Sequence, residues 1–193
     1  RPGPVEPMID KHLLRTWIEL DRGALAHNIR LFRDLLPAGC RLMGVAKSNA
    51  YGHGLYDFVP AVESLGADWL GVDSIVEAVT LRGTGIKKPI LVLGFTLPAR
   101  MTEAARDGIR LTISSFESLD ALARSGVEDR IRIHIKIDTG LHRQGFLPAQ
   151  VSDLIAALRR GHPRLEVEGL YTHFAAAKDP GDPAYTRSQI EAF

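Results

Sequence analysis

Hydrophobic positions follow two alternating spacings along the chain. In stretches such as "WLGVD", "PILVLGF" and "IRLTIS" the apolar residues are contiguous or recur at every second position, which is typical of strands. Between them, in stretches such as "LYDFVPAVESLG" and "SFESLDALARSG", they recur every three or four residues, which is typical of helices. Six strand–helix units are expected, over residues 41–66, 69–85, 89–108, 109–126, 130–161 and 165–193. This alternation predicts a parallel sheet with helical crossovers.

Local signals define several element ends. "TWIEL", residues 16–20, alternates like a short strand, and residues 21–36 have helical spacing with Asp21 as the expected N-cap. Glycine is expected to end four helices in a left-handed conformation, at Gly85, Gly108, Gly126 and Gly161.

The fold class is predicted to be α/β, as a (β/α)8 barrel of the TIM type. Several strands end in polar or charged residues, and in this fold the carboxyl ends of the strands build the active site. A doubly wound sheet is the alternative. Such a barrel typically needs about 250 residues, so residues 16–193 are expected to hold only about six of its eight units. Residues 1–15 are expected to be a tail or an expression remnant, and the last helix is expected to be truncated.

Composition narrows the possible partners. The formal net charge is +1, from 24 basic and 23 acidic residues, which gives no electrostatic reason to expect nucleic acid or an anionic membrane as a partner. The single cysteine, Cys40, excludes an internal disulfide and fits a reducing compartment such as the cytoplasm. No apolar run approaches the roughly 20 residues of a membrane span.

One strand combines apolar and ionisable residues in strict alternation. In "RIRIHIKID" the isoleucines are expected to pack under helices while the ionisable side chains point into the barrel. Burying such groups is costly unless they are paired or used, so the pattern indicates a polar lumen under an active site. The alternative is an edge strand with a solvated face. The isoleucines are Ile131, Ile133, Ile135 and Ile137, and the ionisable residues are Arg132, His134, Lys136 and Asp138.

A lysine ends the strand-like stretch "LMGVAK". If Lys47 shares a face with Val45, its amine points into the barrel mouth, where a partly desolvated lysine is a nucleophile suited to forming a Schiff base with an aldehyde. A solvated lysine at a strand end is the alternative. The loop that follows favours the functional interpretation, because Gly52 and Gly54 let the backbone approach a ligand and Tyr51 adds a hydroxyl.

Polar residues also follow the fifth and sixth expected strands. "TGLHRQGF" places Arg143 above the fifth strand, where its planar guanidinium suits a carboxylate or a ring oxygen. His173 ends "GLYTH" and, in a closed barrel, points to the same mouth as Lys47. A structural role for this histidine is the alternative.

Three motifs in this order, "VAKSNAYGHG", "IKIDTGLHRQGF" and "GLYTHFA", resemble the alanine racemase family. "TWIELDRGALAHNI" and "ILVLGF" are also similar to the family pattern, so the resemblance runs from about Thr16 to Phe193. It implies a barrel that binds pyridoxal 5'-phosphate (PLP), a C-terminal β domain and a homodimer in the full-length protein.

The resemblance also implies a role for each matching residue. Lys47 would form the Schiff base with PLP and exchange the α-proton of the substrate. Arg143 would bond the phenolic oxygen of the cofactor, and Lys136 is a candidate for carbamylation, since burial favours the neutral amine that reacts with carbon dioxide. Tyr51 would contact the phosphate, Leu93 would form a pocket wall, and His173 would lie against the pyridine ring.

The implied activity is the PLP-dependent interconversion of L-alanine and D-alanine for peptidoglycan precursors. Racemisation needs one base on each face of the carbanion. The resemblance places the second base, a tyrosine, in the C-terminal domain, so residues 1–193 alone are expected to be inactive. Two residues depart from the family pattern: Ser48 stands where alanine is commoner, and Gln144 where an aliphatic residue is usual.

Three alternatives to alanine racemisation remain at this point. The enzyme could be a serine or broad-specificity amino-acid racemase, because most of the substrate pocket is expected outside this sequence. It could be a PLP-binding barrel without catalytic activity. The chain could also be an inert fragment whose open sheet edges pair with another chain.

Overall fold

The chain forms a six-stranded parallel sheet with its strands in sequence order. A computed structural model describes residues 11–127, 129–160, 164–181 and 183–193. The strands are β1 (Met43–Val45), β2 (Trp69–Val72), β3 (Ile90–Val92), β4 (Arg110–Ile113), β5 (Ile131–Lys136) and β6 (Leu165–Tyr171). All pairs between neighbouring strands are parallel. The strand order never reverses, as it would in a doubly wound sheet, so that alternative is wrong.

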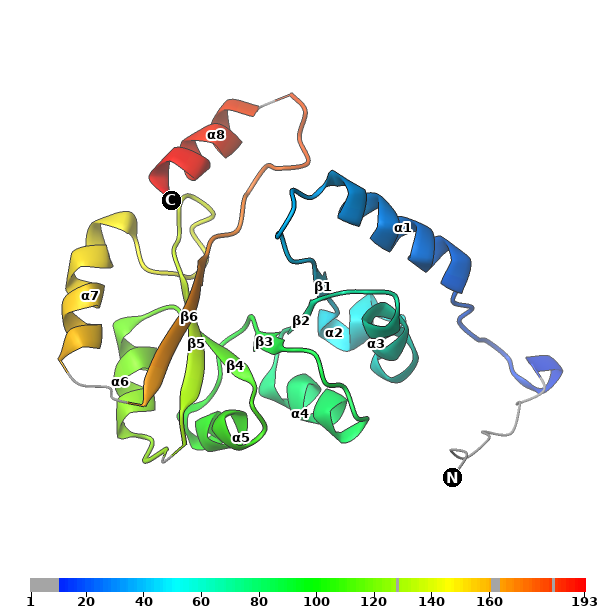
Figure 1. The fold of residues 1–193 in the computed structure, drawn as a ribbon, viewed down its shortest axis with the longest axis horizontal. Coiled ribbons are helices and arrows are strands. Elements are labelled where there is room, and N and C mark those ends of the chain that lie inside the picture. Colours follow the sequence, from blue (N-terminus) through cyan, green and yellow to red (C-terminus); the bar gives the residue numbers. More distant parts are fainter. Residues whose placement is uncertain (1–10, 128, 161–163, 182) are drawn as a thin grey trace.

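Helices connect the strands and cover the outer side of the sheet. The α-helices are α1 (Arg22–Leu35), α2 (Lys47–Tyr51), α3 (Leu55–Ser64), α4 (Ile75–Gly83), α5 (Met101–Arg106), α6 (Phe116–Arg124), α7 (Val151–Arg159) and α8 (Pro183–Ala192). Short 3-10 helices are η1 (Lys11–Leu13), η2 (Pro98–Arg100) and η3 (Pro148–Gln150). Helices α3 to α7 follow one another around the strands (Figure 1). This is the arrangement of a partial (β/α) barrel, which confirms the predicted fold class.

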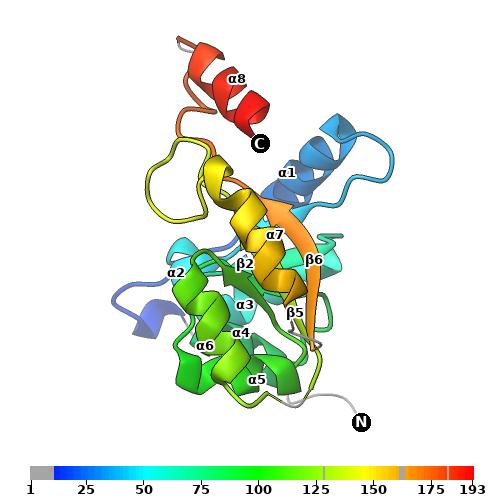
Figure 2. The same ribbon diagram turned by 90° about the vertical axis from the view of Figure 1, so that its left-hand side faces the viewer.

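Helix α8 lies at one end of the molecule, at the opposite end from α5 (Figure 2). It follows β6 in the chain, and its residue Gln189 donates from Nε2 to Thr139 Oγ1 and to the carbonyl oxygen of His173, at 3.3 and 3.4 Å. The carboxyl ends of β5 and β6 therefore face α8. None of the described helices has the length and apolar character required to cross a bilayer.

The core lies between the sheet and the outer helices. Four isoleucines, three in β5 and one directly after it, are each at most 5% exposed. Their burial confirms that they pack under the helices. The alternative of a solvated edge strand is wrong, because β5 pairs with β4 on one side and β6 on the other. The isoleucines are Ile131, Ile133, Ile135 and Ile137.

The predicted caps are largely confirmed. Asp21 accepts a hydrogen bond from Ala24 N at 3.0 Å and begins α1. The three described glycines of the four have positive φ angles: 92° at Gly85, 60° at Gly108 and 69° at Gly126. Gly161 lies outside the described residues, as do residues 1–10 of the expected tail.

The strand predicted at residues 16–20 is wrong. This segment belongs to no helix or strand, and Trp17 and Ile18 are 52% and 65% exposed. Alternation alone does not make a strand, because a strand needs a neighbour that accepts and donates its backbone hydrogen bonds. Among the described residues, no strand pairs with this segment.

Candidate functional site

A pocket of about 390 Å³ opens where the strands end. Six of its lining residues are those singled out in the sequence: Lys47, Tyr51, Leu93, Lys136, Arg143 and His173. The other five are Val45, Asp73, Gly94, Gln144 and Tyr171. A larger hollow of about 790 Å³ runs along residues 172–180, but a single surface segment forms it and His173 is its only candidate residue.

Lys47 follows β1 and begins a left-handed turn. The next three residues, Ser48 to Ala50, have φ angles of 55°, 54° and 53°, and Tyr51 has a φ of 54°. A run of left-handed non-glycine residues is strained, at roughly 1–2 kcal/mol per residue. Strain of this kind persists only where the surroundings fix it, and it concentrates at functional sites.

Hydrogen bonds from two elements hold this turn. Asn49 N donates to Glu77 Oε1 at 3.0 Å, and Asn49 Oδ1 accepts from Leu55 N at 2.9 Å. Glu77 belongs to α4, where its Oε2 accepts from Ser74 N at 3.2 Å in a capping box. The sequence after β1 is thus fixed to the helix after β2, and this arrangement places Lys47 and Tyr51 on one pocket.

The loop after β5 is organised by a buried carboxylate. Asp138 is 7% exposed and accepts hydrogen bonds from the backbone N–H groups of Gly140, His142 and Arg143 at 3.0, 3.0 and 2.9 Å. Burial acts to raise the pKa of Asp138, but these three donors outweigh it and hold that pKa below its usual value. The Asp138 carboxylate therefore holds the loop in place, and Asp138 is not among the residues that line the pocket.

Lys136 is a buried amine in the pocket wall. It is 2% exposed, and its Nζ has no hydrogen-bond partner within the described part of the chain. Burial lowers the pKa of Lys136, and the nearby Arg143 guanidinium lowers it further, while Asp138 acts in the opposite direction. An unsatisfied buried amine is costly, so this position calls for a functional explanation.

The end of β6 contributes an aromatic hydroxyl and an imidazole. Tyr171 forms a hydrogen bond between its hydroxyl and Thr112 Oγ1 at 2.9 Å, and burial raises the pKa of Tyr171. Partial desolvation lowers the pKa of His173, and the positive charges of Arg143, Lys136 and Lys47 lower it further. The pocket thus places the basic side chains of Lys47 and Arg143 around His173, which suits an anionic ligand.

The strands β2 and β3 complete the wall. Gln144 donates from Nε2 to the carbonyl oxygen of Leu93 at 3.1 Å, so the side chain that departs from the family pattern braces a pocket residue. Gly94 packs so closely that a Cβ atom there would collide with the carbonyl oxygen of Asp73. This close approach fixes the loops after the two strands side by side.

Sequence reasoning did not assign Asp73 or Tyr171 to the site. Asp73 stands directly after the buried strand β2, and a polar residue at that position is a signal that could have found it. Tyr171 precedes His173 by two residues, so strand alternation could have placed the two on one face.

The family model described as "Alanine racemase, N-terminal domain" matches residues 20–193. The chain belongs to the alanine racemase family. An alanine racemase from Symbiobacterium thermophilum is 44% identical over 180 residues, which cover 92% of this chain and 47% of that protein. The chain therefore spans about half the length of the curated alanine racemases that it matches.

Solved structures of alanine racemases share the same barrel. A crystal structure of alanine racemase from Bacillus anthracis with bound L-Ala-P matches with a TM-score of 0.86 and 33% identity, covering 92% of this chain and 46% of that one. A histidine racemase from Leuconostoc mesenteroides matches with a TM-score of 0.81 and 34% identity, covering 89% of this chain and 46% of that one. The barrel is thus common to racemases named for different amino acids.

Proposed function

We propose that the chain is the cofactor-binding part of a PLP-dependent racemase that interconverts L-alanine and D-alanine for peptidoglycan precursors. The observation that carries this proposal is the convergence of Lys47, Arg143 and His173 on one pocket, in a chain of the alanine racemase family.

The residues present fit PLP. The pocket volume of about 390 Å³ lies within the usual range for small-molecule sites, roughly 300–1,000 Å³. The cationic wall suits an anionic phosphate and phenolate, and Lys47 offers an amine to an aldehyde. We propose that Lys47 attaches the cofactor, Tyr51 contacts its phosphate, Leu93 and His173 pack against its ring, and Arg143 bonds its phenolic oxygen. When bound, PLP would supply an electron sink for the charge left on the substrate's α-carbon.

The chain's own residues would bind, orient and move protons. Lys47 Nζ, half-buried at the mouth of the barrel, would accept the α-proton on one face of the substrate and return it. Arg143 would hold the cofactor in position for this transfer, since its guanidinium offers a rigid set of donors. Inversion also needs a proton donor on the opposite face, which the family resemblance assigns to a tyrosine of a second domain.

Lys136 is proposed as a carbamylated lysine. Its neutral amine would attack carbon dioxide, forming an N–C bond and releasing a proton. The lowered pKa of Lys136 favours the neutral form, and the adjacent Arg143 would pair with the resulting anion. The buried Nζ, which has no hydrogen-bond partner among the residues that the structure describes, supports this assignment.

The deciding experiment compares lysine variants of the full-length protein supplied with PLP. Lys47→Ala is expected to lower the rate of D-alanine formation by about a thousandfold, because it removes both the attachment point and a base. Borohydride reduction followed by peptide mass spectrometry should place the cofactor on Lys47 in the parent protein. Lys87→Ala, on the exposed surface, is the matched control and should leave both results unchanged. Absence of racemisation in the parent protein would refute the proposal.

A second substrate class is supported by the comparisons. An amino-acid racemase from Enterococcus faecalis is 35% identical over 93% of this chain and 25% of that protein, and the barrel is shared with a histidine racemase. Rates with L-serine and L-histidine beside L-alanine would decide between a specific and a broad racemase.

The proposal includes a homodimer in the cytoplasm. The free, exposed cysteine, Cys40, is compatible with a reducing compartment. The family resemblance supports the dimer, and light scattering of the full-length protein would test it.

A further inference from the structure

Strand β6 contains one residue more than its pairing with β5 requires. Val167 lies opposite Ile133, and Gly169 lies opposite His134, so in the strand register no residue of β5 lies opposite Glu168. An extra residue in one strand is a β-bulge, which bends the strand and redirects the side chains beyond it.

The bulge changes which residues of β6 face the pocket. Side chains alternate between the two faces of a sheet, so a shift by one residue exchanges the faces. With the bulge, Tyr171 lies opposite Lys136, and both line the pocket. In a regular pairing, Leu170 would take the place opposite Lys136, and Tyr171 would pair with the buried Ile137 instead. His173, two residues beyond Tyr171, would leave the pocket with it.

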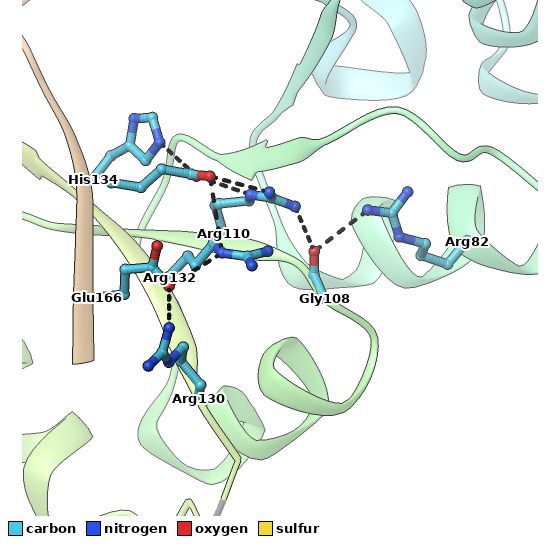
Figure 3. Close-up of polar contacts among 8 residues, drawn as sticks. Arg82, Gly108, Arg110, Arg130, Arg132, His134 and Glu166 are labelled. Atoms are coloured by element: carbon cyan, nitrogen blue, oxygen red, sulfur yellow. Dashed lines mark hydrogen bonds and ion pairs between the residues drawn. The ribbon is translucent and has the colours of Figure 1, made fainter. Parts of the chain in front are cut away.

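Side chains on β4 and β5 contact the extra residue, Glu168. Arg110 donates from Nε and Nη2 to the two carboxylate oxygens of Glu168 at 2.9 and 3.2 Å, and His134 Nε2 lies 3.3 Å from Oε2. The side chains of Arg110, Glu168 and His134 are 12%, 24% and 14% exposed. Figure 3 shows dashed lines from Arg110 and from His134 to the carboxylate that lies between them. Two-point contacts of this kind are among the stronger and more directional interactions in proteins.

Two further residues shape this cluster. The Arg110 guanidinium lies 5.2 Å from the ring centroid of Trp69, and the His134 ring lies 5.3 Å from it. At Gly169, a Cβ atom would lie 2.8 Å from two atoms of the His134 imidazole. Glycine therefore gives His134 the room to lie over β6 and reach Glu168.

We propose that Glu168 is a positioning residue, which sets the register of β6 on β5 so that Tyr171 and His173 face the pocket. The carboxylate offsets the unpaired backbone of the bulge through its contacts to Arg110 and His134. The inference rests on the proposed function, because the pocket is the same, but its geometry can be measured without catalysis.

The test uses the full-length protein and three variants. Glu168→Ala removes the contacts of the bulge, and Glu168→Gln keeps one acceptor oxygen but replaces the other with an NH2 donor and removes the charge. Glu166→Gln is the matched control, since Glu166 also pairs with arginines, Arg130 and Arg132 at 3.4 Å, but lies in regular register opposite Arg132.

Two measurements report on the register of β6. The first is the pKa of His173 from histidine NMR of the apoprotein, assigned with His173→Gln. In Glu168→Ala this pKa is expected to rise toward the ordinary value, because the ring becomes more exposed to solvent and leaves the charges of Arg143 and Lys47. The second is the affinity for PLP, which is expected to fall by about 100-fold. Glu168→Gln should show a smaller change in the same direction, and the control should match the parent protein.

An unchanged His173 pKa in Glu168→Ala would overturn the inference, as would an equal change in Glu166→Gln. Loss of folding in both Glu168 variants would also overturn it, because the residue would then stabilise the whole sheet and not only the register of β6. A parent protein that neither binds PLP nor racemises would refute the proposed function, while the His173 measurement would still decide the inference.

Discussion

At the scale of single residues, Lys136 is a position where function is expected to cost stability. A buried amine without a hydrogen-bond partner destabilises a fold, and residues of this kind are retained where function needs them. Its neighbours on the same strand are isoleucines that face the helices, so the cost falls on one side chain in the pocket wall.

We predict that Lys136→Met leaves the free energy of unfolding unchanged or raises it by about 1 kcal/mol, because an apolar chain of similar length replaces the desolvated amine. The same variant should weaken racemase activity, since Arg143 loses the neighbour proposed to orient it. Urea unfolding and the rate of D-alanine formation are the two measurements. Arg132→Met, on the same strand but exposed, is the control; a marked loss of stability in Lys136→Met would contradict the prediction.

At the scale of elements, the left-handed turn of α2 depends on the helix that follows the next strand. Glu77 closes the capping box of α4 with Ser74 and also accepts from Asn49 N in the turn. One carboxylate thus connects a helix cap to the segment that carries Lys47 and Tyr51.

Glu77→Ala is expected to lower the free energy of unfolding by about 2 kcal/mol, because it removes a cap interaction and a charged acceptor. It should also weaken PLP binding, because the strained turn loses a restraint. Ser115→Ala removes the comparable capping box of α6, whose residues do not line the pocket, and should cost about 1 kcal/mol without changing PLP affinity. Equal PLP affinity in Glu77→Ala and the parent protein would show that the turn holds itself.

At the scale of the whole molecule, two histidines couple stability to pH. Burial lowers the pKa of His134, although Glu168 acts to raise it, and partial desolvation with nearby cations lowers the pKa of His173. The folded state therefore binds fewer protons than the unfolded state as pH falls through the ordinary histidine value. Stability is fully present above about pH 6.5 and declines below it. The lowered pKa values of Asp138 and Glu168 extend the loss below about pH 4.

Urea unfolding of the full-length protein at a series of pH values from 8 to 5 would measure this decline. His134→Gln should flatten it, because one of the two titrating groups is gone. His27→Gln, on the exposed side of α1, should leave the slope unchanged. A stability that stays constant from pH 7 to pH 5 would contradict the prediction.

The sequence by itself determined the order of strands and helices, the buried face of β5, and the motifs carrying Lys47, Arg143 and His173. These features follow from spacing between near neighbours, which the chain displays directly. The segment at residues 16–20 had the same local signal but no partner strand, so its prediction failed.

Only the tertiary structure decided the left-handed turn after Lys47, the position of Asp73 in the pocket lining, and the register of β6. Strict alternation from Glu166 would place Leu170, not Tyr171, on the pocket side. The bulge reverses this because Glu168 is bound by Arg110, which lies 58 residues earlier in the chain. Periodicity is a local property, whereas register depends on contacts between distant segments that exist only once the sheet has formed.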